Sequence, residues 1–349
     1  MRDSQPAPTD FPFGELPKAE LHLHLEGSLE PATVVELAAR HGETVTLEEV
    51  ASRYSCRDFA GFIQAYIWVT SFLREPEDYA IAMRRLAQTL ISQNIVYGEI
   101  ILSVGVMQWR KQNVAENFAA ISAAASDARS QGLRAAFIFD FIRQFGPEPA
   151  MLVAEAAAEL RDSGVVGFGM GGDELSLPTA DFRDVFSFAR EAGLHSVPHT
   201  GEMGDAQSIR DAIHELGAER IGHGIAAVHD SALCEELAER DIALEICPGS
   251  NLASGALARQ TGNPTATLAG HPLKLLFDRG VRVTLSTDDP AMFRTSLAQE
   301  YRHAAALGFT SAELIRLAEN SYHAAFLRAD EKQALLRVFR ERAAALGLI

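Results

Sequence analysis

The sequence predicts an α/β protein with a (β/α)8 (TIM) barrel fold. Short apolar runs recur along the 349 residues, and helix-length segments separate most of them. Alternating strands and helices are typical of a parallel sheet, and eight such units can close into one barrel. A barrel with insertions accommodates a chain of this length as a single unit.

The predicted strands are apolar runs followed by helical patterns. They cover residues 19–25, 96–103, 134–142, 165–170, 194–199, 220–224, 242–248 and 281–287. The segments between them, such as "PAMLVAEAAAELRDSG" at 149–164, place apolar residues at helical spacing. Gly164, Gly193 and Gly280 stand just before strands, where we expect them to end helices.

The connection between the first two predicted strands is unusually long. It contains "FAGFIQAYIWVTSFLREPEDYAIAMRRLAQTLISQ" at 59–93, a pattern that predicts at least two helices. We therefore expect a helical insertion over 29–95 that can cover the barrel mouth. Residues 1–13 are predicted to form a flexible lead-in, and residues 14–349 a single domain.

Composition narrows the function classes. The formal net charge is −16, from 31 basic and 47 acidic residues, whereas nucleic-acid binders usually carry a basic face. No apolar run reaches the roughly 18 residues of a membrane span, and the first residues do not resemble a signal peptide. Cys56, Cys234 and Cys247 form no CxxC pair or disulfide framework, which favours a reducing cytoplasm.

Chemically unusual side chains gather at the carboxyl ends of the predicted strands. His22 and His24 are two apart on the first strand, so they point to the same face. His199 ends the fifth strand, His223 ends the sixth, and Asp288 follows the eighth. In a (β/α)8 barrel these ends converge on one small volume, where active sites lie.

These groups are costly to bury without partners, and a divalent cation would supply one. Three imidazoles and one carboxylate suit a borderline metal such as zinc. We therefore expect one Zn²⁺ per chain, bound by His22, His24, His199 and Asp288. A zinc site with an open position lowers the pKa of bound water to about 7 and makes hydroxide available as a nucleophile.

The remaining polar residues near these strand ends suggest catalytic roles. Glu202, three residues after His199 in "HTGE", is expected to donate a proton to the substrate. His223 is expected to orient or deprotonate the attacking water. Asp289, beside Asp288, is expected to hold a substrate atom.

Two other motif matches are rejected. "GFGMGG" at 167–172 satisfies GxGxxG, but no helix pattern follows, so no dinucleotide site is predicted. "HELGAERIGH" at 214–223 lacks a second histidine four residues after the first, which excludes a zincin helix.

Six motifs, in chain order, resemble the adenosine deaminase family of the amidohydrolase superfamily. They are "PKAELHLHLEGS", "GGDE", "HTGE", "RIGHG", "CPGSN" and "STDDP". The resemblance runs from about Leu16 to beyond His303. It implies a zinc-dependent aminohydrolase acting on cyclic amidines, in which hydroxide adds to the carbon bearing the amino group and ammonia leaves. The other zinc-deaminase type needs a P-C-x-x-C pattern, which this sequence lacks.

By resemblance, the four zinc ligands are those named above. Glu202 is implied to protonate a purine ring nitrogen, and His223 to position and activate the zinc-bound water. The backbone of Gly172 is implied to contact the purine ring, and Asp289 to contact its imidazole nitrogen. The expected substrate-binding residues are His24, Glu26, Gly172 and Asp289.

The glutamate at position 26 leaves the choice of substrate open. Adenosine deaminases usually have Asp here, in contact with the ribose 5′-hydroxyl, and the longer Glu moves the carboxylate by more than about 1 Å. Adenine deaminases also have Glu, but lack the Gly-Asp-Glu kept here at 172–174. "LHSVPH", "HPLK" and "DDPAMF" are similar to 6-aminodeoxyfutalosine deaminases of menaquinone biosynthesis, whose nucleoside substrate carries a bulky group in place of the 5′-hydroxyl.

The expected substrate is therefore a small purine nucleoside: adenosine, 2′-deoxyadenosine or 6-aminodeoxyfutalosine. Adenine is the alternative, as is another barrel hydrolase of the superfamily. Two-metal hydrolases commonly use a bridging carboxylated lysine, and no lysine ends a predicted strand here. A non-catalytic relative is expected to have lost metal ligands, whereas this chain keeps every candidate. Nucleic-acid and membrane partners are not expected.

Overall fold

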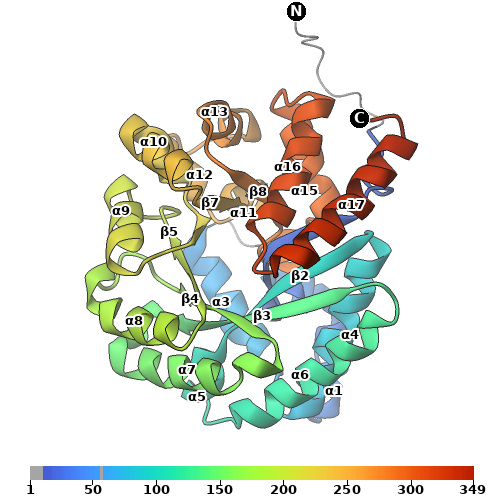
Figure 1. The fold of residues 1–349 in the computed structure, drawn as a ribbon. Coiled ribbons are helices and arrows are strands. Elements are labelled where there is room, and N and C mark those ends of the chain that lie inside the picture. Colours follow the sequence, from blue (N-terminus) through green and yellow to red (C-terminus); the bar gives the residue numbers. More distant parts are fainter. Residues whose placement is uncertain (1–10, 56–57) are drawn as a thin grey trace, which may run out of the picture.

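The computed structural model describes residues 11–55 and 58–349. Eight parallel strands run in the order β1 to β8 at the centre of the molecule (Figure 1). They are β1 Lys18–His24, β2 Ile95–Leu102, β3 Arg134–Ile142, β4 Val165–Gly171, β5 His195–Thr200, β6 Arg220–His223, β7 Ala243–Ile246 and β8 Val283–Leu285. Each strand overlaps its predicted range, and the predicted (β/α)8 barrel is confirmed.

The barrel closes where the last strand meets the first. His24 N donates to Asp288 O at 2.9 Å, and Asp288 N donates to His22 O at 3.1 Å. Strand β8 is shorter than the predicted 281–287 because the chain after Leu285 turns toward β1. There, the Ser286 hydroxyl accepts a hydrogen bond from His22 N at 3.1 Å. This closure brings Asp288 beside the first strand.

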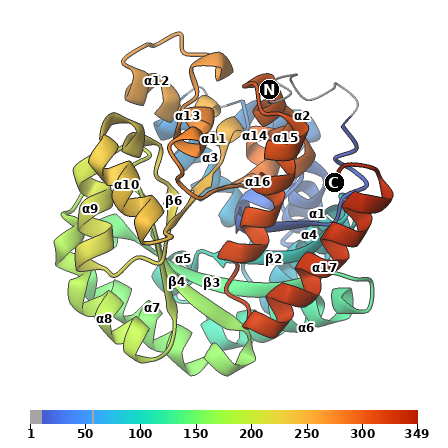
Figure 2. The same ribbon diagram turned by 45° about the horizontal axis from the view of Figure 1, so that its top comes forward.

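Helices surround the strands (Figures 1 and 2). They are α1 Pro31–Arg40, α2 Leu47–Arg53, α3 Phe59–Thr70, α4 Pro76–Ser92, α5 Val104–Trp109, α6 Val114–Arg129, α7 Pro147–Glu159, α8 Arg183–Glu191, α9 Ala206–Glu215, α10 Ser231–Glu239, α11 Pro248–Ala253, α12 Ala256–Thr261, α13 Leu273–Asp278, α14 Pro290–Phe293, α15 Leu297–Ala306, α16 Ser311–Ala324 and α17 Ala329–Ala345. Gly164, Gly193 and Gly280 have positive φ. Each follows the end of a helical segment and precedes a strand, as predicted.

The predicted helical insertion follows β1 and contains α1 to α4. Helix α3 begins where the Asp58 carboxylate accepts a hydrogen bond from Gly61 N at 2.8 Å, as an N-cap does. Helix α4 begins with Pro76 and a capping box between Glu75 and Asp78. One side of α3 faces the cavity at the carboxyl ends of the strands.

The N-terminal lead-in predicted over 1–13 lies mostly outside the described residues. At its end, Phe11 and Phe13 are buried against the hydrophobic core, and Phe13 O accepts a hydrogen bond from Lys18 Nζ at 2.7 Å. Cys234 and Cys247 are buried and unpaired, while Cys56 lies outside the described residues. No helix in the described parts of the chain is long and apolar enough to cross a membrane.

Candidate active site

A cavity of about 1220 Å³, including its open mouth, lies over the carboxyl ends of the strands. Its polar floor is formed by strand-end residues, and its walls by α3 and neighbouring loops. The floor includes His24, Asp140, His199, Glu202, His223, Asp288 and Asp289. The predicted polar residues from β1, β5, β6 and β8 are therefore brought together at one end of the barrel.

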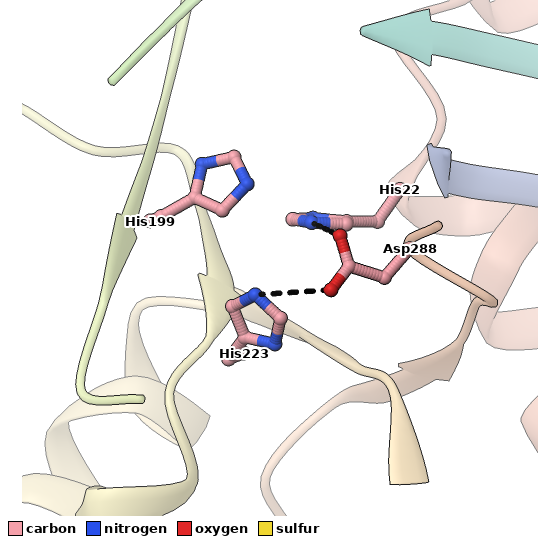
Figure 3. A group of neighbouring side chains, drawn as sticks. All are labelled: His22, His199, His223 and Asp288. Carbon is pink, nitrogen blue, oxygen red and sulfur yellow. Dashed lines mark ion pairs between the residues drawn. The ribbon is translucent and has the colours of Figure 1, made fainter. Parts of the chain in front are cut away.

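The four predicted zinc ligands lie close together at one end of the barrel. Asp288 Oδ1 lies 3.4 Å from His22 Nε2 and 3.3 Å from His24 Nε2. His24 Nε2 lies 3.2 Å from His199 Nε2. Figure 3 shows Asp288 between His22 and His223, with His199 facing them from β5.

These separations fit a bound divalent cation. Zinc ligands lie about 2.0–2.2 Å from the ion, so the donor atoms of a tetrahedral set are roughly 3.3–3.6 Å apart. His22 Nε2 is buried and makes no hydrogen bond within the described residues. Two groups of possible ligand atoms lie within 4.8 Å of one another: one comes from His22, His199, His223 and Asp288, and the other from His24, Asp288 and Asp289. Both groups share Asp288.

The electrostatics of His24, His199 and Asp288 suit a cation. Burial lowers the pKa of His24 to about 4 and holds the pKa of His199 well below its usual value, so both rings are neutral. Burial raises the pKa of Asp288, but nearby imidazoles hold it well below its usual range. Neutral imidazoles and an ionised carboxylate are the forms that bind metal. Burial lowers the pKa of His22, but the Asp288 and Glu245 carboxylates raise it to about 10, so this ring must lose a proton to bind a metal.

The ring of His22 is oriented from behind. Its Nδ1 lies 2.7 Å from Glu245 Oε2, and Glu245 Oε1 accepts a hydrogen bond from Arg220 Nε at 2.6 Å. All three side chains are buried. Asp288 is held similarly, because the Ser250 hydroxyl donates to its Oδ2 at 2.6 Å. Carboxylates behind histidine rings commonly orient metal ligands.

Backbone geometry at the site is unusual. His223 and Asp288 have backbone φ values of 62° and 64°, in the left-handed region that residues other than glycine rarely adopt. Such outliers cluster at functional sites. Gly27 is required by close packing, because a Cβ atom there would lie 1.6 Å from Asp289 Oδ1.

Glu202 is held at the edge of the floor by a loop that follows β5. The Ser254 hydroxyl donates to Glu202 Oε1 at 3.1 Å, and His223 Nε2 lies 3.8 Å from Glu202 Oε2. Burial and the charges of Asp288 and Glu174 raise the pKa of Glu202 to about 8. Its carboxyl group is therefore largely protonated at neutral pH.

The "GGDE" motif has two structural parts. Gly172, with φ of 94°, lines the cavity. Glu174 anchors the Glu202 loop, because its carboxylate accepts hydrogen bonds from Met203 N and Gly204 N, both at 2.8 Å. The resemblance pointed to Gly172, and the sequence alone did not reveal the anchoring role of Glu174.

A buried hydrogen-bond chain fixes the ring state of His223. Leu273 N donates to His271 Nδ1 at 3.1 Å, so His271 Nε2 carries the proton that reaches Asn251 Oδ1 at 3.2 Å. The Asn251 amide then donates from Nδ2 to His223 Nδ1 at 3.2 Å. Neutral His223 consequently carries its proton on Nε2, the atom that faces Glu202 and Asp288.

Glu26 is buried behind the cavity wall rather than among the residues that line it. Its Oε1 accepts a hydrogen bond from Ser103 N at 3.0 Å, and its Oε2 accepts one from the Tyr66 hydroxyl at 3.3 Å. Tyr66 and Ser103 themselves line the cavity. Glu26 is thus placed to act on a substrate through these two neighbours.

Sequence reasoning missed several polar residues of the site. Asp140 lines the cavity, and its buried Oδ1 has no hydrogen-bond partner among the described residues. Asp140 and Glu245 each interrupt an apolar strand, a signal that could have identified them. Asn251 and His271 gave no such signal, because their role depends on contacts between loops.

Comparison with known proteins identifies the family. The model of the family described as "Adenosine deaminase" matches residues 17–341. The chain belongs to the adenosine deaminase family. An adenine deaminase of Agrobacterium fabrum is 38% identical over 91% of this chain and 96% of its own. An aminodeoxyfutalosine deaminase of Streptomyces coelicolor is 39% identical over 91% of this chain and 82% of its own.

Solved structures agree with this family membership. The adenine deaminase of Arthrobacter aurescens has a TM-score of 0.86 at 27% identity, covering 93% of this chain and 98% of that one. An amidohydrolase of Burkholderia ambifaria, solved with bound Zn, has a TM-score of 0.85 at 25% identity and covers 99% of both chains. The protein is therefore a deaminase, a hydrolase of amidine C–N bonds in a metal-dependent superfamily.

Proposed function

We propose that this deaminase removes the 6-amino group of an adenine nucleoside whose 5′ position carries an extended group, as in 6-aminodeoxyfutalosine, releasing ammonia. One observation carries the proposal: the cavity continues from its polar floor along the apolar side of α3 to α5. The Streptomyces coelicolor relative, named an aminodeoxyfutalosine deaminase, supports it and suggests a place in menaquinone biosynthesis.

We assign the binding of one zinc ion to His22, His24, His199 and Asp288. When bound there, the ion supplies Lewis-acid activation of water. The contacts of Glu245 with His22 and of Ser250 with Asp288 support this set, because they aim the donor atoms at a common point.

Glu202 acts as the proton donor to the purine ring. Its raised pKa, about 8, keeps a transferable proton on the carboxyl group at neutral pH. His223 positions the attacking water, since its Nε2 points into the space between Glu202 and Asp288. Both side chains belong to the cavity floor.

The purine ring is bound by Gly172 and Asp289. Gly172 contacts it through the backbone, and the Asp289 carboxyl contacts the imidazole nitrogen. Burial and the neighbouring Asp288 carboxylate raise the pKa of Asp289 well above its usual value, so this group can donate a hydrogen bond. His24, on the same floor, contacts the substrate as well as the ion.

Other polar groups that line the cavity favour a nucleoside over a free base. Asp140 is buried with an unpartnered oxygen, and buried polar groups are normally satisfied, so a substrate hydroxyl fits beside it. The Tyr66 hydroxyl and Ser103 Oγ, 2.8 Å apart, supply further polar contacts.

The buried, unpaired Cys234 and Cys247 support action in the cytoplasm.

The proposal is tested by measuring kcat/KM side by side for 6-aminodeoxyfutalosine, adenosine, 2′-deoxyadenosine and adenine, following loss of the 6-amino group by absorbance. We expect 6-aminodeoxyfutalosine to be preferred by at least about tenfold, roughly 1.4 kcal/mol in transition-state binding. Equal or higher kcat/KM for adenine or adenosine would refute it.

Adenine is the second candidate, and the placement of Glu26 favours it. Glu26 lies outside the residues that line the cavity, and its carboxylate accepts hydrogen bonds from Ser103 and Tyr66, so it offers no direct contact to a ribose hydroxyl. The Agrobacterium fabrum relative, named an adenine deaminase, supports this candidate. In the same assay, it predicts that adenine has the highest kcat/KM.

A further inference from the structure

Arg110 occupies an unusual position on the cavity wall. It follows α5 and lines the cavity, partly buried, beside the C-terminal turn of α3. Its Nη2 donates to Ile67 O at 3.0 Å and to the Thr70 hydroxyl at 3.0 Å. Its Nη1 donates to Thr70 O. All three acceptors are uncharged, and no ion pair with a carboxylate occurs within the described residues.

The charge of Arg110 stands out against the rest of the lining. Among the described residues that line the cavity, it is the only arginine or lysine. Apart from the histidines, the other ionisable side chains of the lining are carboxyl groups, those of Asp140, Glu174, Glu202, Asp288 and Asp289. The Nε of Arg110 makes no hydrogen bond within residues 11–55 and 58–349. The guanidinium group therefore keeps both charge and a donor available to a ligand.

An apolar path connects the polar floor to Arg110. The ring of Tyr66 lies 6.5 Å from the ring of His24, and Thr70 is one helical turn beyond Tyr66, about 6 Å along α3. The wall beside this path carries no charged side chain before Arg110 among the described residues. Its apolar members are Phe62, Ile63, Ile67, Val106 and Trp109, and Tyr66, Thr70 and Ser103 add hydroxyl groups.

We propose that Arg110 binds a carboxylate at the far end of an apolar or aromatic arm on the 5′ side of the substrate. This inference rests on the proposed function, because it requires a nucleoside whose arm extends past Tyr66. A guanidinium group suits carboxylates, which it contacts through charge-assisted hydrogen bonds. The apolar wall favours a carboxylate on an arm over a phosphate attached directly to the ribose.

The test compares two adenine nucleosides that carry the same 5′ arm, one ending in a benzoate and the other in its methyl ester. In the wild-type protein we expect kcat/KM for the benzoate to exceed that for the ester by about 10- to 100-fold, as charge-assisted hydrogen bonds are lost in the ester. This ratio requires no variant. A wild-type ratio near one overturns the inference.

The variant Arg110→Gln should reduce that ratio to below about threefold. Arg84→Gln, which breaks an exposed pair with Glu77, is the matched control and should keep the wild-type ratio. A purely structural role for Arg110 in capping α3 predicts equal losses for both nucleosides and an unchanged ratio, which would overturn the inference.

Further outcomes distinguish a wrong assignment of the anion from a wrong proposed function. If AMP is deaminated faster than the benzoate and loses this advantage in Arg110→Gln, the anion is a 5′-phosphate and the carboxylate assignment is wrong. If neither extended nucleoside is deaminated faster than adenine, the proposed function itself fails. A good ester substrate without any benzoate preference would remove only the role of Arg110.

Discussion

At the scale of single residues, Glu202 is the side chain whose change separates chemistry from folding. Glu202→Gln keeps the shape and the acceptor for Ser254, but removes the proton that the carboxyl group transfers. We expect kcat to fall by about 10²- to 10⁴-fold, with zinc content and Tm unchanged. Steady-state kinetics, metal analysis and thermal melting check this.

The raised pKa of Glu202 gives a signed pH dependence. The donor is the protonated form, so kcat/KM should decline as the pH rises through about 8, and Glu202→Gln should lack this decline. Glu239→Gln, on the exposed end of α10, is the control and should behave as wild type. Near-normal activity of Glu202→Gln would remove its assigned role.

Asn251 controls a second residue-scale property, the ring state of His223. In Asn251→Asp the donor to His223 Nδ1 becomes an acceptor, which favours a proton on Nδ1 and leaves Nε2 without one. We expect kcat to fall by about 10- to 100-fold while KM changes little. Nitrogen NMR shifts of His223 report the change of tautomer.

The control for this prediction is Asn263→Asp. Asn263 is exposed after α12, and its side-chain oxygen accepts hydrogen bonds from Thr265, which an aspartate also accepts. This variant should keep wild-type kinetics. Unchanged kcat in Asn251→Asp, with the His223 tautomer altered, would show that the ring state of His223 does not matter for turnover.

At the scale of elements, the insertion that walls the cavity depends on Asp78. This buried carboxylate at the start of α4 accepts hydrogen bonds from Arg40 Nε at 2.9 Å and from Arg74 N and Glu75 N, both at 3.0 Å. It also lies 2.8 Å from His41 Nε2. One side chain thus joins α1 to α4, the helices that precede and follow α2 and α3 in the sequence.

Asp78→Asn should lower the free energy of unfolding by about 2–4 kcal/mol, because buried donors lose a charged acceptor. Burial raises the pKa of the Asp78 carboxyl group, but the hydrogen bonds from Arg40 and the backbone outweigh this effect and hold the pKa below its usual value. The stabilisation is therefore present above the unfolded-state pKa of about 3.9 and lost as the pH falls through the lower folded-state pKa.

Urea unfolding of wild type and Asp78→Asn, at pH 7 and at pH 3, measures this difference. Asp58→Asn is the matched control: it changes the N-cap of α3, where asparagine caps as well as aspartate, so stability should be nearly unchanged. An equal effect of the two substitutions at pH 7 would contradict the special role of Asp78.

At the scale of the whole molecule, the sequence was sufficient for features that depend on local periodicity. Strand alternation placed His22 and His24 on one face, and the barrel brought them to the ends of β5 and β8. The missing features depend on contacts between distant segments. Glu245 is explained only by Arg220 and His22, which come from two other strands. The contacts of Glu26 with Tyr66 and Ser103 likewise required the fold.

Zinc is expected to stabilise the whole barrel, because its proposed ligands include residues of the first strand and the segment after the last. The barrel seam, where β1 meets the segment after β8, has two backbone hydrogen bonds near the site. One joins His24 to Asp288, and the other joins Asp288 to His22. An ion in contact with His22, His24 and Asp288 would bridge this seam. Binding to the folded state alone stabilises it by about 4 kcal/mol at 1,000 times Kd, roughly 5 °C in Tm for a chain of this size.

We therefore expect about one zinc per chain, and chelation should abolish activity and lower Tm by about 5 °C. Added Zn²⁺ should restore both. His24→Gln should bind zinc weakly and show little effect of chelator on Tm, whereas His214→Gln, which changes an exposed residue of α9 paired with Glu236, should keep the wild-type response. Metal analysis with thermal melting measures all of these. A metal-free preparation with full activity and unchanged Tm would refute the zinc assignment, because the barrel seam would then be stable and the site competent without an ion.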